Sequence, residues 1–319
     1  MGIIDAESKK YFSDNSRFAD TFNYLIYGGK EVIKPDELRD LNTAELVIPY
    51  GNDTRVPMQK YRDLFKLWDV KTDNKVIYVA LGAELQNNVH YAMPIKDALY
   101  DMIGYSNQVS EKRRSYMGKK EQGEVTVDNG VVKIKLSSDE FLSGLKKTDK
   151  LIPIVTVVIY IGDKAWDGPR SLYDMLDIRD EALKKFIPNY WINLISPADM
   201  ADDEFKKFHT ELSYAMRLIK HQKDDADKII AEEGHRMISA ETAHFLKSAM
   251  KLDLEIKEKD GGVDMCEALE KRYKQEKILG VIKGLQIAGF TENDIITKVI
   301  ENFNVTKDYV LALLKPQEA

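Results

Sequence analysis

Two acidic residues in neighbouring strand-like segments, Asp63 and Glu84, are the side chains of this sequence best suited to chemistry. The segments that carry them flank the polar stretch T-D-N-K at residues 72–75, a pattern typical of a β-hairpin turn. With the turn centred on this stretch, Asp63 lies opposite Glu84, and the Cβ atoms of directly paired residues are about 5 Å apart. Because side chains alternate along a strand, Gln86 shares their face, whereas Lys66 points to the opposite one.

Two carboxylates at this separation repel each other, so a cation must lie between them or one of them must hold a proton. A hard divalent cation is the simplest solution, because Mg²⁺ takes one or two protein carboxylates and keeps waters that a substrate phosphate can replace. Mg²⁺, with Mn²⁺ as the alternative metal, is therefore the expected cofactor. The spacing leaves a second interpretation open, since a β-bulge would shift the register and leave two unrelated acids on a solvated sheet face.

The elements that position these residues include both helices and strands. A helix is predicted over residues 18–27, with Ser16 as its N-cap and the glycines at 28–29 as its stop. Further along we expect a short strand at 45–50, a helix at 92–112, a hairpin with Asn129 and Gly130 in its turn, and a buried strand at 151–162. This order predicts a mixed α/β or α+β domain built on a small sheet.

Beyond about Asp199 the chain is predicted to be almost entirely helical. Thr291 with Asp294 resembles a capping box, and Asn304 or Thr306 caps one more helix. The last helices are interpreted as a helix-turn-helix or a dimerisation module, and their weak basicity favours dimerisation, which would make a homodimer. The expected organisation is a core domain at residues 1–198, a helical region at 199–275 and a helical tail at 276–319.

Six segments carry a resemblance to a known family: RFADTFNYLIYGG, YRDLF, AELQ, YAMPIKDALYDMIGYSNQV, DEFLSGLKKTDKLIPIVTVVIYIGDKAWDGPRSLYDML and GGVDMCEALE. In order and spacing they resemble the Rpn-type recombination-promoting nucleases, a transposase-related family of the PD-(D/E)XK nuclease superfamily. The resemblance runs roughly from Arg17 to Glu270. It implies an α/β fold with a restriction-endonuclease-like core, a mixed sheet flanked by helices, and metal-dependent cleavage of DNA.

The resemblance also implies roles for individual residues. The family's two acidic positions fall on Asp63 and Glu84, which are the expected metal ligands and catalytic pair. The superfamily lysine, which polarises the attacking water, falls on Gln86, so we expect the positive charge to come from Lys96 on the following helix. Asp20 on the first helix resembles an acidic position that some relatives use as a further metal ligand.

A surface for DNA is expected beside this site. Lys96, Tyr100 and Gln108 share one face of the predicted helix, which in the superfamily packs next to the site and its scissile phosphate. Basic residues follow at Lys112, Arg113, Arg114, Lys119 and Lys120, and again at Lys133, Lys135, Lys146 and Lys147. Such groups track a phosphate backbone. An ordinary solvated charged face is the alternative that the residue types leave open.

Composition argues against several other classes of protein. The formal charge of −6 argues against a chain coated with nucleic acid, although a local basic groove is compatible with it. The single cysteine, Cys266, excludes disulfides within the chain and a Cys-based zinc cluster, and it fits a cytoplasmic location. We expect no signal peptide, because the segment MGIIDAESKK is not apolar, and no membrane partner, because no apolar run is long enough to span a bilayer. The histidines show no metal-ligand spacing.

The leading hypothesis is therefore a Mg²⁺-dependent DNA endonuclease associated with recombination or mobile elements. The alternative is a non-catalytic DNA-binding or adaptor protein of a mobile element with a degenerate nuclease fold. A degenerate fold kept only for packing is a third interpretation. Recombination, transposition and defence against foreign DNA all remain open as biological roles.

Overall fold

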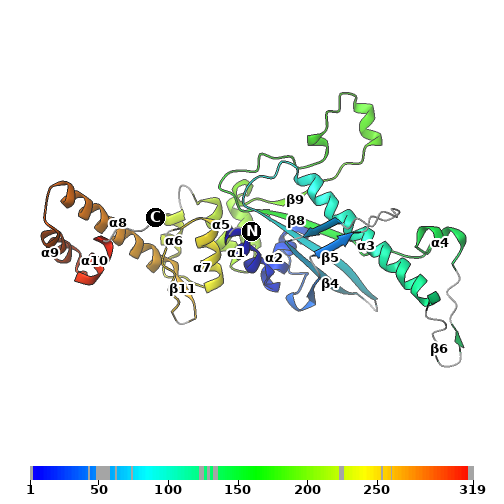
Figure 1. Cartoon of the computed structure of the whole chain (residues 1–319), viewed down its shortest axis with the longest axis horizontal. Coiled ribbons are helices and arrows are strands. Elements are labelled where there is room, and N and C mark those ends of the chain that lie inside the picture. Colours follow the sequence, from blue (N-terminus) through cyan, green and yellow to red (C-terminus); the bar gives the residue numbers. More distant parts are fainter. Residues whose placement is uncertain are drawn as a thin grey trace. The chain divides into compact units, whose positions relative to one another are not determined.

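The computed structural model of the chain has a mixed α/β architecture and divides into two compact units, Met1–Gln222 and Lys223–Ala319 (Figure 1). It describes residues 3–41, 44–47, 58–61, 63–72, 75–121, 126–127, 130–131, 136–222, 226–252, 254–259 and 261–314. All candidate site residues belong to the first unit. The three-part division expected from the sequence, with boundaries at 198/199 and 275/276, stays a prediction.

A five-stranded sheet forms the centre of the first unit, in the order β1, β4, β5, β8, β9. These strands span Leu38–Asp40, Leu64–Thr72, Lys75–Gln86, Ile154–Tyr160 and Asn193–Ile195. β1, β4 and β5 pair antiparallel, whereas β5, β8 and β9 pair in parallel, so the sheet is mixed. The parallel pair β5–β8 needs a crossover connection, and helix α3 (Met93–Glu121) lies within it (Figure 1).

The hairpin of β4 and β5 has the predicted register. Leu64 pairs with Ala83 at one end, and Thr72 pairs with Lys75 at the turn end. The turn residues 73 and 74 lie outside the described residues. The antiparallel hairpin and its alternation of faces, from which the candidate site was inferred, are therefore confirmed.

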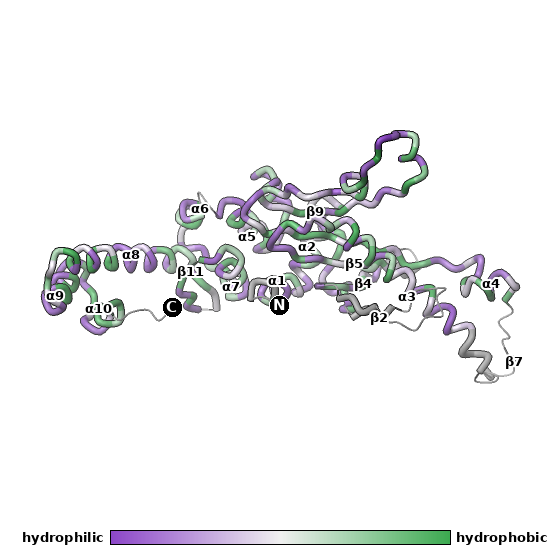
Figure 2. The backbone as a smooth tube through the Cα atoms, turned by 45° about the horizontal axis from the view of Figure 1, so that its top comes forward, coloured by the Kyte–Doolittle hydropathy of each residue, from purple (hydrophilic) through white to green (hydrophobic). Residues whose placement is uncertain are grey.

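Different helices cover the two faces of the sheet. On one face, Tyr27 of α2 (Asn15–Tyr27) packs edge-on against Trp68 of β4, with ring centroids 6.3 Å apart. On the other face, Asp101 of α3 accepts a hydrogen bond from Thr156 of β8 (2.7 Å). The core on this second face consists of the buried residues Met93, Val158, Tyr160, Trp166 and Ile192. Figure 2 shows hydrophobic stretches along the strands between these layers.

The ends of α2 are set by two short-range signals. Gly28 adopts φ +62°, a left-handed conformation that stops the helix where predicted. The predicted N-cap at Ser16 is wrong, because the Asp14 carboxylate accepts hydrogen bonds from the backbone N–H groups of Ser16 and Arg17 (3.1 Å each). A further helix, α1 (Ile3–Ser13), precedes α2 and was not predicted. The helix predicted at 92–112 is confirmed as α3, which continues to Glu121.

Shorter elements complete the first unit. They are β2 (Ala44–Val47) paired with β3 (Met58–Tyr61), β6 (Thr126–Val127) paired with β7 (Gly130–Val131), α4 (Ser138–Ser143), α5 (Leu212–Lys220), and 3₁₀ turns at Pro35–Glu37, Tyr173–Met175, Glu181–Phe186, Pro197–Asp199 and Asp202–Lys207. The strand predicted at 45–50 overlaps β2, and residues 48–50 lie outside the described residues. The second predicted hairpin forms, but Gly130 pairs with Val127 and so belongs to a strand, while Asn129 is not described.

Helices dominate the second unit, as predicted. They are α6 (Ala226–Glu233), α7 (Ala240–Ala249), α8 (Met265–Ile287), α9 (Glu292–Phe303) and α10 (Lys307–Leu314), beside the two-stranded pair β10 (Met237–Ile238) and β11 (Val263–Asp264). In Figure 2, α8 alternates between hydrophilic and hydrophobic residues along its turns. Buried residues of α8, α9 and α10 form one core: Ile278, Ile282, Ile295, Ile296, Val299 and Val310.

Thr291 and Thr306 are N-caps in this unit, as predicted, but the Asp294 carboxylate accepts the Thr291 hydroxyl (2.6 Å) and so does not complete a capping box. Thr291 Oγ1 accepts the backbone N–H of Asp294 (3.3 Å) and begins α9. Thr306 Oγ1 accepts the N–H of Tyr309 (3.3 Å) and thus caps α10. Asn304 instead ends α9 in a left-handed conformation, with φ +49°. Within the described ranges, no helix combines the length and the apolar character needed to cross a bilayer.

Candidate functional site

Asp63 and Glu84 come together where β4 begins and β5 ends. Asp63 immediately precedes the first paired residue of β4, Leu64. Its Oδ2 accepts a hydrogen bond from the backbone N–H of Leu85 (2.9 Å), so the carboxylate lies beside the residue that follows Glu84. The structure therefore places Asp63 at the strand end where the hairpin register opposes it to Glu84.

Lys96 joins Glu84 from the first turns of α3. Its Nζ lies 2.8 Å from Glu84 Oε2, and the Glu84 side chain is 1% exposed while that of Lys96 is 28% exposed. A carboxylate buried to this degree stays ionised only beside a cation, because its charge has lost the stabilisation that water provides. The Lys96 ammonium also lies 5.7 Å from the centre of the Tyr100 ring. Lys96 thus supplies a positive charge at the strand end, and its catalytic role stays a prediction.

Lys66 lies on the opposite face of the sheet. It is buried, forms an ion pair with Asp40, and lies 5.4 Å from the centre of the Phe18 ring on α2. Since Glu84 faces α3 instead, Lys66 and Lys96 are separated by the sheet. The preference for Lys96 over Lys66 as the site cation therefore agrees with the geometry.

Gln86 ends β5 two residues beyond Glu84. Its backbone carbonyl accepts a hydrogen bond from Ile161 N–H (2.9 Å), which extends the pairing with β8. The half-exposed side chain follows Glu84 on the same face, and it makes no hydrogen bond to any residue that the structure describes. Its amide is therefore positioned to bind water or a ligand near the two carboxylates.

Asp20 has a different environment. Its buried carboxylate accepts hydrogen bonds from His209 N–H (3.0 Å), Thr210 N–H (2.8 Å) and Thr210 Oγ1 (2.6 Å). In the described part of the chain, no group of three His, Cys, Asp or Glu side chains could hold a metal ion, so Asp20 is not gathered with Asp63 and Glu84. Its role as a third ligand stays a prediction. Its hydrogen bonds link α2 to the segment that precedes α5.

The predicted DNA-contact residues on α3 also brace the fold. Gln108 binds the backbone of Ile152 through both ends of its amide, donating to the carbonyl (3.0 Å) and accepting from the N–H (2.6 Å). Tyr105 accepts the N–H of Ile154 (3.1 Å) in the same way. Tyr100 is 6% exposed beside Lys96. Gln108 therefore holds the entry of β8 against α3, and its contact with DNA stays a prediction.

One buried polar cluster was not predicted. Asp101 accepts hydrogen bonds from Thr156 of β8 and from the hydroxyl of Tyr190. It ties the segment before β9 to α3, at the residue directly after Tyr100. The sequence offers no signal for this contact, because Asp101 and Tyr190 are 89 residues apart.

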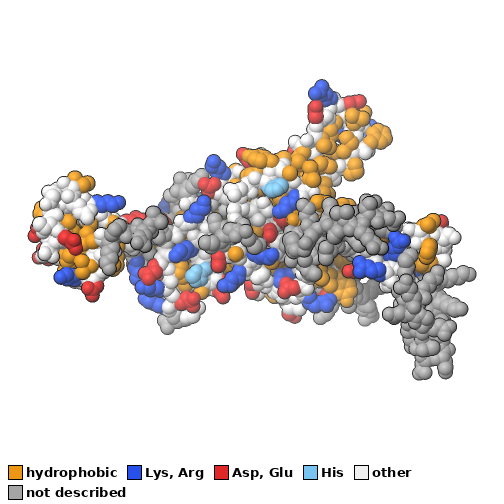
Figure 3. All heavy atoms as spheres, in the orientation of Figure 1, with side chains coloured by type: hydrophobic (Ala, Val, Ile, Leu, Met, Phe, Trp, Pro, Cys, Tyr) orange, Lys and Arg blue, Asp and Glu red, His pale blue; other side chains and the backbone are white. Residues whose placement is uncertain are grey.

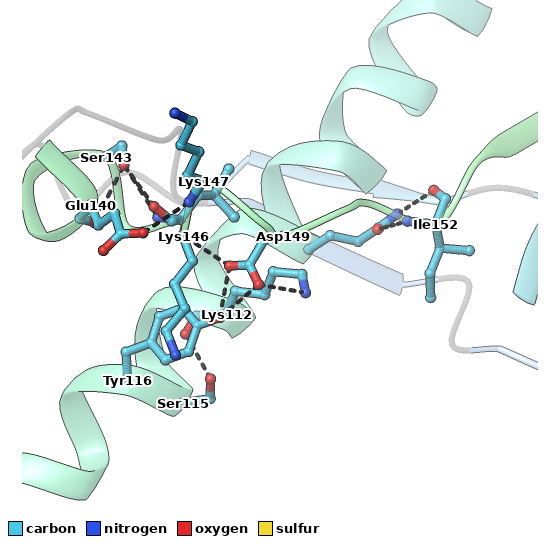
Figure 4. Close-up of polar contacts among 11 residues, drawn as sticks. Lys112, Ser115, Tyr116, Glu140, Ser143, Lys146, Lys147, Asp149 and Ile152 are labelled. Atoms are coloured by element: carbon cyan, nitrogen blue, oxygen red, sulfur yellow. Dashed lines mark hydrogen bonds and ion pairs between the residues drawn. The ribbon is translucent and has the colours of Figure 1, made fainter. Parts of the chain in front are cut away.

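The distal half of α3 is basic. Lys112 is half-buried, while Arg113 and Arg114 are exposed. Tyr116 donates its hydroxyl to Asp149 (2.7 Å), which lowers the pKa of the Asp149 carboxyl and raises the pKa of Tyr116 to about 12 (Figure 4). Figure 3 shows Lys and Arg side chains beside this part of α3 and α4. The side chains of Lys119, Lys120, Lys133 and Lys135 lie outside the described residues.

Comparison with known families gives a match to part of the chain. Residues 138–245 match a family model described as "Putative transposase, YhgA-like". The chain has no significant match among curated proteins or solved structures. The matched segment includes β8, Asp149 and Tyr190, whereas Asp63, Glu84, Gln86 and Lys96 precede it. The similarity is therefore to a transposase-like family over part of the chain, and the chemistry of the strand end must be argued from its geometry.

Proposed function

We propose that the first unit is a divalent-metal-dependent nuclease that hydrolyses phosphodiester bonds in DNA, using a restriction-endonuclease-like core. The observation that carries the proposal is the gathering of Asp63, Glu84 and Lys96 at the end of β5. Lys96 Nζ lies 2.8 Å from Glu84, and Asp63 accepts from the backbone N–H of Leu85. The mixed sheet with helices on both faces and the transposase-like match over residues 138–245 support it.

The donor set fits Mg²⁺. Two carboxylates from adjacent strands offer the hard oxygen ligands that Mg²⁺ prefers, and this ion takes its remaining ligands from water and phosphate rather than from a full protein cage. Asp63 and Glu84 are the residues that would hold it. A bound Mg²⁺ would supply Lewis-acid chemistry by polarising the scissile phosphate and lowering the pKa of a water.

The chain's own residues have separate roles beside the metal. Lys96 stabilises the negative charge that develops on the phosphate, because its partly exposed ammonium already faces the carboxylate pair. Gln86 hydrogen-bonds the attacking water or a phosphate oxygen. The hydrogen bond from Leu85 N–H fixes the Asp63 carboxylate and leaves its second oxygen for a ligand.

Incubation of the purified protein with supercoiled plasmid tests this function. Nicked or linear DNA should form with Mg²⁺ or Mn²⁺ and not with EDTA. Asp63→Asn and Glu84→Gln remove one charge each with little change in shape, and each should lower cleavage by at least about 100-fold, since metal and water act as a unit. DNA affinity should persist in both variants, because it rests on phosphate contacts made elsewhere.

Two outcomes would replace the proposal. If the wild-type protein binds DNA but never cuts it with any divalent ion, it is a non-catalytic DNA-binding or adaptor protein of a mobile element. If cutting persists undiminished in Asp63→Asn, the active site lies elsewhere. A Glu301→Gln variant, which removes an exposed acid from α9, controls for an unspecific loss of negative charge.

A further inference from the structure

A second charged surface lies at the far end of α3 from Lys96. It is formed by Lys112, Arg113 and Arg114 of the helix together with Lys146, Lys147 and Lys150 of the segment that follows α4. We name these six residues the distal basic surface. It is built from two separate segments that the structure fastens together, so its charges hold fixed positions relative to α3.

Acidic residues fasten the segment through its backbone rather than through its lysine side chains. Asp149 accepts the N–H of Lys146 (2.8 Å) and the hydroxyl of Tyr116, while Glu140 accepts the N–H of Lys147 (3.0 Å) (Figure 4). Both carboxylates are thus engaged by uncharged donors. The nearest ammonium to Asp149 is that of Lys112, at 3.8 Å. The acids position the loop and leave most of the basic groups for an external anion.

Most of the cations of the distal basic surface are not neutralised by an acidic side chain. Among the residues that the structure describes, Arg113, Arg114, Lys147 and Lys150 form no ion pair, and all four are exposed. The stem of Arg113 packs against Gly144, where an added Cβ would lie 3.0 Å from Arg113 Cβ. Gly144 also has φ +74°, so a glycine is required there for the loop to approach the helix. The surface therefore combines several unneutralised cations with a fixed backbone.

The distance to Lys96 relates the distal basic surface to the proposed cleavage site. Lys96 and Lys112 lie on one continuous helix, sixteen residues apart, which corresponds to a rise of about 24 Å. In B-form DNA successive base pairs are about 3.4 Å apart, so this span covers about 7 base pairs. A duplex lying along α3 would present phosphates to both ends of the helix at once.

We propose that the distal basic surface binds the phosphate backbone of a DNA duplex about 7 base pairs from the phosphate held beside Glu84 and Lys96. The inference rests on the proposed function, and it adds that the substrate is a duplex with a flank of this length on one side. The contacts reach phosphate oxygens alone, so they set affinity and position without reading sequence.

The first test is DNA binding by a variant that keeps the loop intact. Lys146→Ala/Lys147→Ala/Lys150→Ala removes three ammonium groups but retains the backbone N–H groups that Asp149 and Glu140 accept. Binding to a long duplex in EDTA should weaken at least about tenfold at physiological salt, and the log–log salt slope should become less steep by about 2–3. An unchanged affinity and slope would overturn the proposal.

The matched control removes three lysines that already form ion pairs. Lys184, Lys207 and Lys271 pair with Glu181, Glu204 and Glu267, and Lys184→Ala/Lys207→Ala/Lys271→Ala lowers the net charge by the same amount. The salt slope of this variant should stay within about 0.5 of the wild type if the lost charges were neutralised already. An equal weakening in both variants would indicate a general charge effect and contradict a specific surface.

The second test is duplex length. Hairpin-closed duplexes of about 5, 9 and 14 base pairs are compared, because only the longer ones span both ends of α3. Wild-type affinity should rise about tenfold between the first and second lengths, whereas the triple variant should show only the gradual rise expected from additional binding registers. The absence of a step in the wild type would overturn the proposed spacing.

These binding results are separate from the test of cleavage. A wild-type protein that shows the length step but never cuts DNA would disprove the nuclease and leave the distal basic surface in place. If the wild-type protein cuts plasmid and the triple variant binds DNA normally, the nuclease stands and the distal basic surface is disproved. If the triple variant loses the wild type's binding to phosphatidylglycerol vesicles but keeps its binding to DNA, the surface is a membrane contact and the proposal is overturned.

Discussion

Lys96 Nζ lies 2.8 Å from Oε2 of Glu84, in a pair where the carboxylate is 1% exposed and the lysine 28% exposed. The ammonium reaches solvent, while the carboxylate depends on its neighbours. The two residues are twelve positions apart, and they meet because β5 ends just before α3 begins. We therefore expect the removal of Lys96 and the removal of the Glu84 charge to change stability by unequal amounts.

The Lys96→Met variant should lose stability because the Glu84 charge remains buried without this cation. We expect the free energy of unfolding to fall by roughly 3 kcal/mol, the lower end of the range for a broken buried pair since Lys96 is partly exposed. Adding Glu84→Gln should recover most of the loss, because the double variant buries no unpaired charge. Urea denaturation of the wild type, the two single variants and the double variant measures the coupling.

Millimolar Mg²⁺ should stabilise Lys96→Met more than it stabilises the wild type. A divalent cation bound by Asp63 and Glu84 replaces the missing positive charge and favours the folded state by mass action. The measurement is the melting temperature with Mg²⁺ and with EDTA. Equal shifts in Lys96→Met and in Lys96→Met/Glu84→Gln would show that the ion binds at another place.

Lys66 provides a matched control for Lys96 on the opposite face of the sheet. Lys66→Met removes a buried ammonium from Asp40 and from the Phe18 ring, so thermal stability should fall. Cleavage per folded molecule should stay within about twofold of the wild type, whereas Lys96→Met should lose about 100-fold or more if its ammonium stabilises the transition state. The comparison uses cleavage rates at a temperature where both variants are folded. Similar losses in both would mean that damage to the sheet, and not the charge, limits cleavage.

Much of this arrangement could be predicted from the sequence because local rules govern it. The polar stretch at residues 72–75 predicts the register in which Thr72 pairs with Lys75, and the alternation of side chains then assigns Lys66 and Glu84 to opposite faces. Gly28 ends α2 because a glycine adopts the left-handed conformation without steric cost. These features depend only on residues near one another in the chain.

Other features depend on tertiary contacts that no local pattern encodes. The partners of Asp20 lie 189 and 190 positions away, so no local pattern predicts that its carboxylate accepts these backbone N–H groups. The N-cap of α2 was misplaced because Asp14 and Ser16 are both good capping residues, and only the backbone conformation at Asp14 distinguishes them. Gln108 is predicted to contact DNA, and the structure adds two hydrogen bonds from its amide to the backbone of Ile152, 44 positions away.

Asp20 offers a test that separates bracing from metal binding. Asp20→Ala leaves the donors at His209 and Thr210 without their acceptor, and we expect a loss of about 2 kcal/mol in the free energy of unfolding. Cleavage per folded molecule should remain close to that of the wild type. Thermal denaturation and cleavage assays of Asp20→Ala and Asp20→Asn check this. Normal stability with abolished cleavage in Asp20→Asn would instead support its predicted role as a third ligand.

The bond between Tyr116 and Asp149 should make stability depend on pH at both extremes. The hydrogen bond from Tyr116 holds the pKa of Asp149 below its usual value, so its contribution is present above about pH 4 and is lost as the pH falls through the folded-state pKa. The same bond and burial raise the pKa of Tyr116 to about 12. Its contribution is therefore present below about pH 10 and is lost as the pH rises towards that folded-state pKa.

Tyr116→Phe deletes both contributions at once. The difference in the free energy of unfolding between the wild type and Tyr116→Phe should be constant from about pH 5 to pH 9 and should shrink below about pH 4 and above about pH 10. Tyr173→Phe is the matched control, since the Tyr173 hydroxyl donates to the carbonyls of Lys184 and Ile187, which do not titrate. Its difference should therefore stay constant through the acid range. Urea denaturation across the pH series provides the measurement. A difference for Tyr116→Phe that does not change between pH 5 and pH 3 would contradict a depressed pKa at Asp149.

Asp149 also positions the backbone of Lys146. Tyr116→Phe should therefore weaken duplex binding by about threefold at neutral pH without altering the salt slope of that binding.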